Sequence, residues 1–224
     1  MAPTQIGQRV VFENSKALIN GLGYDASHAV LTPSYLRSEV LLTTTAASYH
    51  VPVLINDNTN GTPTVREQRL NLQDLFIVCA IQLTLVSGSS TNGAAKFYTY
   101  PNATAFPTGA AQLYNVYNGY LTIQVNNQNI LPKLSLIDHY FVPQTQQNTN
   151  FNVASPTSPA QYAIDMVDMG LNAFQVIEPN IVLNGASNIQ ASYIFPAAPS
   201  AVDSNTYVSL KWYGILAQNC TSVK

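Results

Sequence analysis

The stretch that decides the fold is Leu70–Val86, LNLQDLFIVCAIQLTLV. From Leu75 to Leu85 every odd position is apolar, while the even positions change from apolar to polar along the run. An alternation with a period of two is the pattern of a β-strand. At about 3.3 Å per residue the run reaches roughly 35–40 Å, about twice the length of a common strand. We therefore predict one long strand that crosses a whole sheet, with its odd face wholly buried and its even face covered in part.

The even face of this strand is the more informative one, because it carries Phe76 and Val78. These two large apolar side chains need cover that one small sandwich does not supply. We expect the N-terminal arm, a second sheet or an adjacent subunit to bury both. On this interpretation Ile77→Asp should prevent folding, because it places a charge on the buried face. Thr84→Asp, at the polar end of the even face, should be mild.

Short β-like runs, separated by Gly, Pro and Asn, continue over the rest of the chain, and no long amphipathic helix is predicted. This pattern indicates an all-β sandwich or barrel. Pro52 removes a ladder donor, so its strand is predicted at a sheet edge. In the first run Arg37 and Glu39 are predicted to face solvent. The runs are Tyr35–Thr43, Val51–Ile55, Lys96–Tyr100, Leu121–Val125, Tyr140–Val142, Phe174–Ile177, Ile181–Leu183, Ile189–Phe195 and Tyr207–Leu216.

Residues 1–33 are predicted to form an N-terminal arm, and residues 34–224 the sandwich domain. Apolar residues between Val10 and Leu22 have a nearly helical spacing, and Gly21 and Gly23 would end a short helix there. We expect this arm to pack either on its own domain or on a neighbouring subunit. The N-terminus has no basic segment followed by an apolar run, so the sequence predicts no secretory signal.

The chain is unusually poor in charge. Only 9% of its residues are charged, against about 25% in an average protein, and the formal net charge is −2. Asn, Gln, Ser and Thr replace the missing charges, and such side chains cost less to desolvate than unpaired ions. Depletion of charge also marks the centre of protein–protein interfaces. The composition therefore favours a self-associating protein, with a secreted β-protein of neutral surface as the alternative. The basic residues are interleaved with acids and predict no strong nucleic-acid binding.

The sequence offers little site chemistry. His28, His50 and His139 have no further ligand at metal-binding spacing, and we interpret each as structural. Asp165 and Asp168 would share a face of a helix and act as paired carboxylates or calcium ligands, but two solvated acids are the favoured interpretation. We also searched for GxSxG, HExxH, P-loop and GxGxxG motifs, and none occurs. We predict no catalytic, cofactor-binding or metal-binding residues, and therefore no enzyme.

Two cysteines are too few for a disulfide framework. Cys79 lies in the long strand and is interpreted as a small apolar residue, whereas Cys220 lies in a polar tail. A bond between the two is not the favoured interpretation.

Tyrosine is the remaining candidate for function, with 13 residues in the chain. Tyrosine rings stack on sugars and are also enriched at protein interfaces. The polar segment Gln144–Pro159 is interpreted as a surface loop, with contact to a neighbouring subunit as the alternative. The clustered tyrosines are Tyr98 with Tyr100, and Tyr114 with Tyr117 and Tyr120.

Six short phrases are spread over the chain from about residue 70 onward. They are NLQDLF (Asn71–Phe76), YPNATAF (Tyr100–Phe106), YNGYLTIQVN (Tyr117–Asn126), HYFVPQTQ (His139–Gln146), EPNIVLNG (Glu178–Gly185) and YGILAQN (Tyr213–Asn219). Together they resemble the coat proteins of small tailless icosahedral bacteriophages built on jelly-roll subunits. The resemblance implies a jelly-roll β-sandwich whose function is assembly into a shell, and it carries over no catalytic residues.

We therefore expect a major capsid subunit, located in the virion and assembled in the host cytoplasm, with other copies of itself and other virion proteins as partners. A single roll is favoured by the length of Leu70–Val86, and a compact double roll is the alternative. The runner-up function is a carbohydrate- or receptor-binding domain of a fibre or spike. A hydrolase is the third hypothesis, and it would need Asp165 or Asp168 to meet another acid in a cleft.

Overall fold

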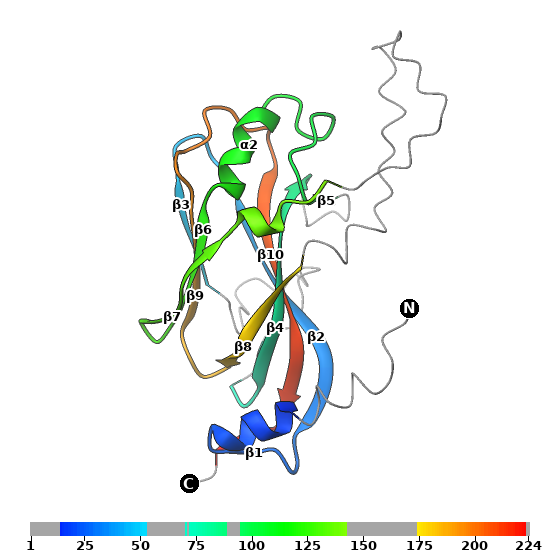
Figure 1. Cartoon of the computed structure of the whole chain (residues 1–224), viewed down its shortest axis with the longest axis vertical. Coiled ribbons are helices and arrows are strands. Elements are labelled where there is room, and N and C mark those ends of the chain that lie inside the picture. The colour runs from blue at the N-terminus through cyan, green and yellow to red at the C-terminus, as the bar shows by residue number, and fades with distance from the viewer. Residues whose placement is uncertain (1–13, 53–69, 71, 89–94, 143–173, 223–224) are drawn as a thin grey trace, which may run out of the picture.

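The computed structural model describes residues 14–52, 70, 72–88, 95–142 and 174–222. Most of their strands form two antiparallel sheets that face each other as a β-sandwich (Figure 1). The prediction of an all-β sandwich is therefore confirmed. All the described strands of the two large sheets belong to one sandwich.

The first sheet has five strands in the order β2-β10-β4-β5, with β8 also pairing with β4. Two long strands lie at its centre, β4 with 13 residues and β10 with 13 residues. Because β10 pairs with β2 over its length and with β4 on its other side, these three strands form the body of the sheet. The strands are β2 (Val30–Leu41), β4 (Leu75–Ser87), β5 (Lys96–Tyr98), β8 (Gln175–Asn184) and β10 (Thr206–Gln218).

The second sheet has four shorter strands in the order β3-β9-β6-β7. β3 pairs only with β9 among the described strands, which confirms that Pro52 lies in an edge strand. Asn126 and Asn127 have φ of 48° and 66° and join β6 to β7, as a tight hairpin requires. The strands are β3 (Ser48–Pro52), β6 (Tyr120–Val125), β7 (Gln128–Ser135) and β9 (Ile189–Ile194).

Helices lie at opposite ends of the long axis of the sandwich (Figure 1). At one end, residues 14–21 form the predicted helix of the arm, next to the small sheet of β1 (Tyr24–Asp25) and β11 (Thr221–Ser222). Gly23, with φ of 82°, follows this helix in the left-handed conformation that commonly ends one. At the other end lie α2 (Ala110–Tyr117) and the short 3-10 helix η1 (Ile137–His139).

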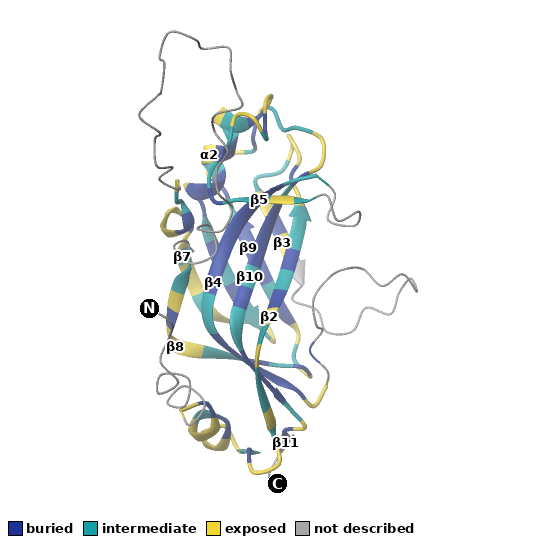
Figure 2. Ribbon diagram, turned by 90° about the vertical axis from the view of Figure 1, so that its right-hand side faces the viewer, coloured by how far each residue is buried: buried dark blue, intermediate teal, exposed yellow. Residues whose placement is uncertain are grey.

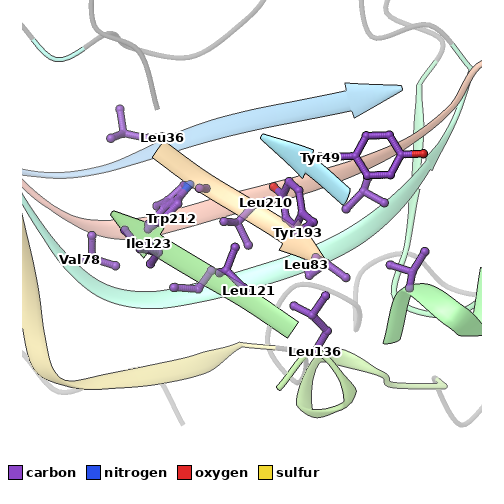
Figure 3. Packing of buried hydrophobic residues seen from close by; sticks show 14 of the residues in the cluster. Leu36, Tyr49, Val78, Leu83, Leu121, Ile123, Leu136, Tyr193, Leu210 and Trp212 are labelled. Carbon is purple, nitrogen blue, oxygen red and sulfur yellow. The ribbon is translucent and has the colours of Figure 1, made fainter. Parts of the chain in front are cut away.

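The main core lies between the two sheets (Figure 3). From the first sheet, Leu210 and Trp212 of β10 point inward. From the second sheet, Leu121, Ile123 and Tyr193 meet them. Burial of such side chains contributes about 1.5–3 kcal/mol each and is the main force that holds the layers together.

The odd residues of β4 from Leu75 to Leu85 are buried as predicted, except for the half-buried Cys79. They do not form one continuous face, however, because they are divided between two cores. The register of β4 against β10 shifts at a β-bulge, where Ala80 lies opposite Tyr213 and Val78 lies opposite Gly214, leaving Cys79 as an extra residue. An extra residue inverts the alternation of a strand. Before the bulge the even residues reach the main core, and after it the odd residues do. The β4 residues of the main core are Phe76, Val78, Ile81, Leu83 and Leu85.

The odd residues before the bulge form a second, smaller core on the other face of the sheet. Leu75 and Ile77 pack there with Ile19 of the N-terminal helix, and Ile215 and Cys220 complete it. The prediction that Phe76 and Val78 are buried is confirmed, since both are fully buried in the core with the second sheet. The helix at residues 14–21 instead covers Leu75 and Ile77, which the alternation alone assigned to the interior of the sandwich.

Other boundaries also differ from the sequence-based expectation. β2 begins at Val30, so residues 30–33 belong to the sheet and not to the arm. β8 runs without interruption through a cis Glu178–Pro179 bond, where two separate runs were predicted. Residues 140–142 follow η1 and form no strand. Cys220 is buried in the second core and is not part of a polar tail, and both cysteines are free.

Candidate functional site

The three histidines are not brought together by the fold. His28 is exposed beside β1, and His139 is fully buried in η1. His50 lies on β3, where its Nδ1 is 2.8 Å from Oγ of Ser192 on β9. His50 and Ser192 are directly opposite in the register of the two strands, and Ser192 is buried. This geometry makes them a cross-strand hydrogen-bonded pair that ties β3 to the sheet.

The predicted carboxylate pair and the long polar loop cannot be placed. Asp165, Asp168 and the segment Gln144–Pro159 all lie outside the described residues. Within the described ranges, no three His, Cys, Asp or Glu side chains lie close enough to hold a metal ion. A search of the same ranges found no helix with the length and apolarity needed to span a membrane.

Four tyrosines form a cluster where α2 meets η1, and we call Tyr100, Tyr114, Tyr117 and Tyr140 the tyrosine cluster. The ring of Tyr140 lies 5.3 Å from that of Tyr117, edge to face, and 6.0 Å from that of Tyr114. Burial, together with the nearby hydroxyls of Tyr114 and Tyr100, raises the pKa of Tyr140. Tyr114 is 45% exposed, so one ring of the cluster is open to a ligand.

The other clustered tyrosines of the sequence separate in the fold. Tyr98 packs edge to face on Phe106 at 5.5 Å. Tyr120 does not belong to the tyrosine cluster, because it lies on β6. There Nζ of Lys133 is 4.8 Å from its ring centre. The sequence did not predict that Tyr140 belongs to the tyrosine cluster, because Tyr140 is distant in sequence from α2 and reaches it only when the chain returns after β7.

Tyr117 is fully buried, and its hydroxyl makes no hydrogen bond within the part of the chain that the structure describes. Burial, and then the hydroxyl of Tyr140, raise the pKa of Tyr117 well above its ordinary value. The folded protein thus keeps this proton above about pH 10, where the unfolded chain loses it. The contribution to stability is complete below about pH 10 and falls as the pH rises further.

We therefore expect Tyr117→Phe to change the free energy of unfolding by no more than about 1 kcal/mol near neutral pH, because it removes an unpaired buried hydroxyl. At about pH 11 the variant should be more stable than the wild type, because the wild type alone must keep Tyr117 protonated. Urea unfolding at both pH values measures the difference, with Tyr120→Phe as the control. An equal loss in variant and wild type would contradict the assignment.

The position of α2 depends on one carboxylate from the loop before β10. Asp203 accepts hydrogen bonds from the backbone N–H of Thr108 at 3.1 Å and of Gly109, the residue that precedes α2, at 3.0 Å. Burial alone would raise the pKa of Asp203, but these hydrogen bonds outweigh it and lower the pKa. The stabilisation is present above the ordinary pKa of about 4 and is lost as the pH falls below it.

Asp203→Ala is expected to lower the free energy of unfolding by about 1 kcal/mol, the usual effect of losing a cap at a helix N-terminus. The effect should disappear under acidic conditions, where the carboxylate is protonated in both states. Thermal unfolding at neutral and acidic pH tests this, with the exposed Asp138→Ala as the control. Equal effects of the two variants at neutral pH would show that Asp203 does not hold α2.

A second group of polar residues lies on the outer face of the first sheet, where a sandwich usually meets water. Two rows cross the strands there, Glu39–Ser209–Thr84 and Arg37–Lys211–Gln82. Nε of Arg37 lies 3.1 Å from Oε1 of Glu39, and their side chains are only 13% and 1% exposed.

Residues of both rows are buried, so the outer face is covered at its centre. The prediction that Arg37 and Glu39 face solvent is therefore wrong, because these two side chains lie at the buried centre of the outer face, although the ends of their strand are exposed. Thr84 is also buried, which overturns the expectation that Thr84→Asp is mild. An unpaired charge at Thr84 should cost several kcal/mol. The alternation of apolar and polar residues did not predict that the outer face of the first sheet is buried.

Aromatic rings lie beside these rows. Nζ of Lys211 is 4.5 Å from the ring centre of Tyr35 and 4.8 Å from that of Tyr213. Phe174 meets Tyr213 edge to face at 4.3 Å, and the guanidinium of Arg37 lies 5.2 Å from the ring centre of Phe97. Together the outer face and the tyrosine cluster give the chain two aromatic surfaces.

Comparison with known proteins does not assign a family. No protein-family model matches the chain, and no curated protein is significantly similar to it.

Proposed function

We propose that the protein is a single jelly-roll subunit that assembles with other copies of itself into the icosahedral shell of a virus, as its major coat protein. The proposal gives the chain a structural and non-catalytic role, in a virion assembled in the host cytoplasm. It rests chiefly on the order in which the strands pair.

The pairing of the strands is nested. β6 pairs with β7, β4 with β8, β3 with β9 and β2 with β10, so the chain runs out and back like one long hairpin. Pairing of β10 with β4 and of β9 with β6 then rolls this hairpin into two sheets with four of its strands each, and the short β5 adds a fifth strand to the first sheet. Eight strands wound in this way support the proposal of a jelly roll, a fold that is common in viral capsid and lectin domains. The described residues contain one such set, which favours the single roll over the double one.

The composition supports assembly as the function of this fold. Only 9% of the residues are charged, and several large apolar side chains stay exposed on the isolated subunit. A surface of this kind loses little free energy of hydration when copies associate. The exposed side chains include Leu22, Val30, Leu41, Ile130 and Val176.

The test is the state of association of the purified full chain, measured by light scattering and negative-stain microscopy. Shell-like particles or defined oligomers are expected. A monodisperse monomer at high concentration, under several salt conditions, would overturn the proposal.

The second candidate function is carbohydrate or receptor binding, and the exposed ring of Tyr114 in the tyrosine cluster favours it. Sugar rings stack on such aromatic faces, and the jelly roll also occurs in lectins. Saturable binding on a glycan array that is lost in Tyr114→Ala, and kept in Tyr35→Ala on the other surface, would support this function over assembly alone.

A further inference from the structure

β2 is a long strand at the edge of the first sheet. Its 12 residues pair with β10 on one side, and no strand of the described ranges pairs with its other side (Figure 2). An open edge offers a row of backbone N–H and C=O groups to another strand. Proteins that must stay monomeric usually block such edges with proline, charged side chains, bulges or short strands. The two charged side chains of β2, Arg37 and Glu39, form an ion pair with each other.

The other edges of the sandwich carry these blocking features. β3 is only five residues long and ends at Pro52. β7 contains Pro132 and Lys133, and β8 contains Pro179. β2 differs from them, since Pro33 lies near its beginning and the stretch from Ser34 to Leu41 has no proline or lysine.

The direction of the backbone groups of β2 follows from two observations. Leu42, just past the end of β2, donates its N–H to the carbonyl of Thr206 at the start of β10, at 2.9 Å. Even-numbered residues therefore bond to β10, and odd-numbered residues turn their N–H and C=O to the open edge. Pro33 fits this assignment, because a proline in a sheet places its missing N–H on the open side.

We propose that β2 of one subunit pairs antiparallel with β2 of a second copy across a two-fold axis at Ser38. The inference rests on the proposed self-association and specifies one of its contacts. In this register Tyr35 lies opposite Leu41 of the partner subunit, and Arg37 lies opposite Glu39 of the partner subunit. The five-stranded sheet then continues into its copy as one sheet of ten strands.

Charge, proline and the length of the overlap together select this register from those that keep odd residues opposite one another. An axis at Val40 pairs only residues 39–41 of the two strands, whereas the axis at Ser38 pairs residues 35–41. A shift of the axis to Arg37 places two arginines opposite each other, and a shift to Glu39 does the same with two carboxylates. Like charges directly opposite each other destabilise a sheet. An axis at Leu36 places Pro33 opposite Glu39 of the partner subunit, where it loses ladder hydrogen bonds. The axis at Ser38 avoids these faults.

The exposed side chains at the two ends of the stretch also fit one another in this register. Tyr35 is 40% exposed and Leu41 is 46% exposed, so both have apolar surface left to bury. The two-fold axis brings an aromatic and an aliphatic side chain together twice, and such cross-strand pairs stabilise antiparallel sheets.

Disulfide cross-linking of co-expressed single-cysteine additions tests the register. Directly opposite, hydrogen-bonded residues have Cα atoms about 5.5 Å apart, within the range that a disulfide spans. Two copies of residue 35 would lie about 20 Å apart, which no disulfide spans. A Tyr35→Cys chain co-expressed with a Leu41→Cys chain of different tag length should shift from monomer to a mixed dimer on a non-reducing gel. Neither variant alone should shift.

The controls are the wild-type chain, which contains Cys79 and Cys220, and Tyr35→Cys co-expressed with Lys133→Cys of β7. If light scattering shows oligomers but the 35–41 mixture links no more than these controls, the β2 contact is refuted and self-association stands. If Tyr35→Cys links with itself, the register is refuted. A chain that remains monomeric in light scattering refutes both the contact and the proposed function.

Discussion

A Gly214→Val variant is expected to yield no folded protein. Gly214 lies at the centre of β10, beside the bulge of β4, and a Cβ there would overlap the carbonyl of Ile77. Overfilling a core with side-chain atoms costs about 1–3 kcal/mol, because neighbouring side chains can move. The obstacle here is backbone that is paired on both sides, so the loss should approach the whole stability of a domain, about 5–15 kcal/mol. Soluble yield, circular dichroism and thermal unfolding measure the outcome.

Gly21→Ala is the matched control, because a Cβ at Gly21 meets no atom within 4 Å. Gly21 closes the helix of residues 14–21, and alanine there should leave stability unchanged or raise it slightly. A Gly214→Val protein that folds with the wild-type melting temperature would show that β10 and β4 do not approach as closely as the structure places them.

The sequence predicted which segments are strands, because alternation is local and can be read without the rest of the chain. The strands predicted at Leu121–Val125 and Tyr207–Leu216 are both confirmed. The bulge at Cys79 could not be predicted from alternation. A bulge is visible in a sequence only when one face is polar, and before Cys79 both faces of β4 are apolar because each meets a different core.

The local nature of the alternation also explains why the burial of Arg37 and Glu39 and the position of Tyr140 were not predicted. Arg37 and Glu39 alternate with apolar residues, and this pattern is identical for a solvated face and for a buried one. The tyrosine cluster was half predicted, because Tyr114 and Tyr117 are neighbours on one helix. Tyr140 reaches them only through the order of the strands, which no local pattern contains.

Ile77→Asp is the second variant with a large expected effect, and we expect it to unfold the chain. Ile77 is fully buried in the second core, where the described apolar neighbours offer no partner for a carboxylate. Burial of an unpaired charge costs more than a domain of ordinary stability can lose. Leu72→Asp, three residues before β4 and 71% exposed, should fold normally. Chemical denaturation of the two variants measures the contrast, and similar stability of both would contradict the burial of Ile77.

A milder change at the same position distinguishes the bulged strand from a regular one. With the bulge, Ile77 shares a core with Ile19 of the N-terminal helix, and its neighbour Val78 faces the other core. In a double-mutant cycle, Ile77→Val and Ile19→Val should show a coupling free energy of at least about 0.5 kcal/mol. Val78→Ala and Ile19→Val should be additive within about 0.3–0.5 kcal/mol, although Val78 follows Ile77 directly. Without the bulge Ile77 would share one interior with Leu83, so coupling of Ile19 to Val78 but not to Ile77 would refute the two-core arrangement.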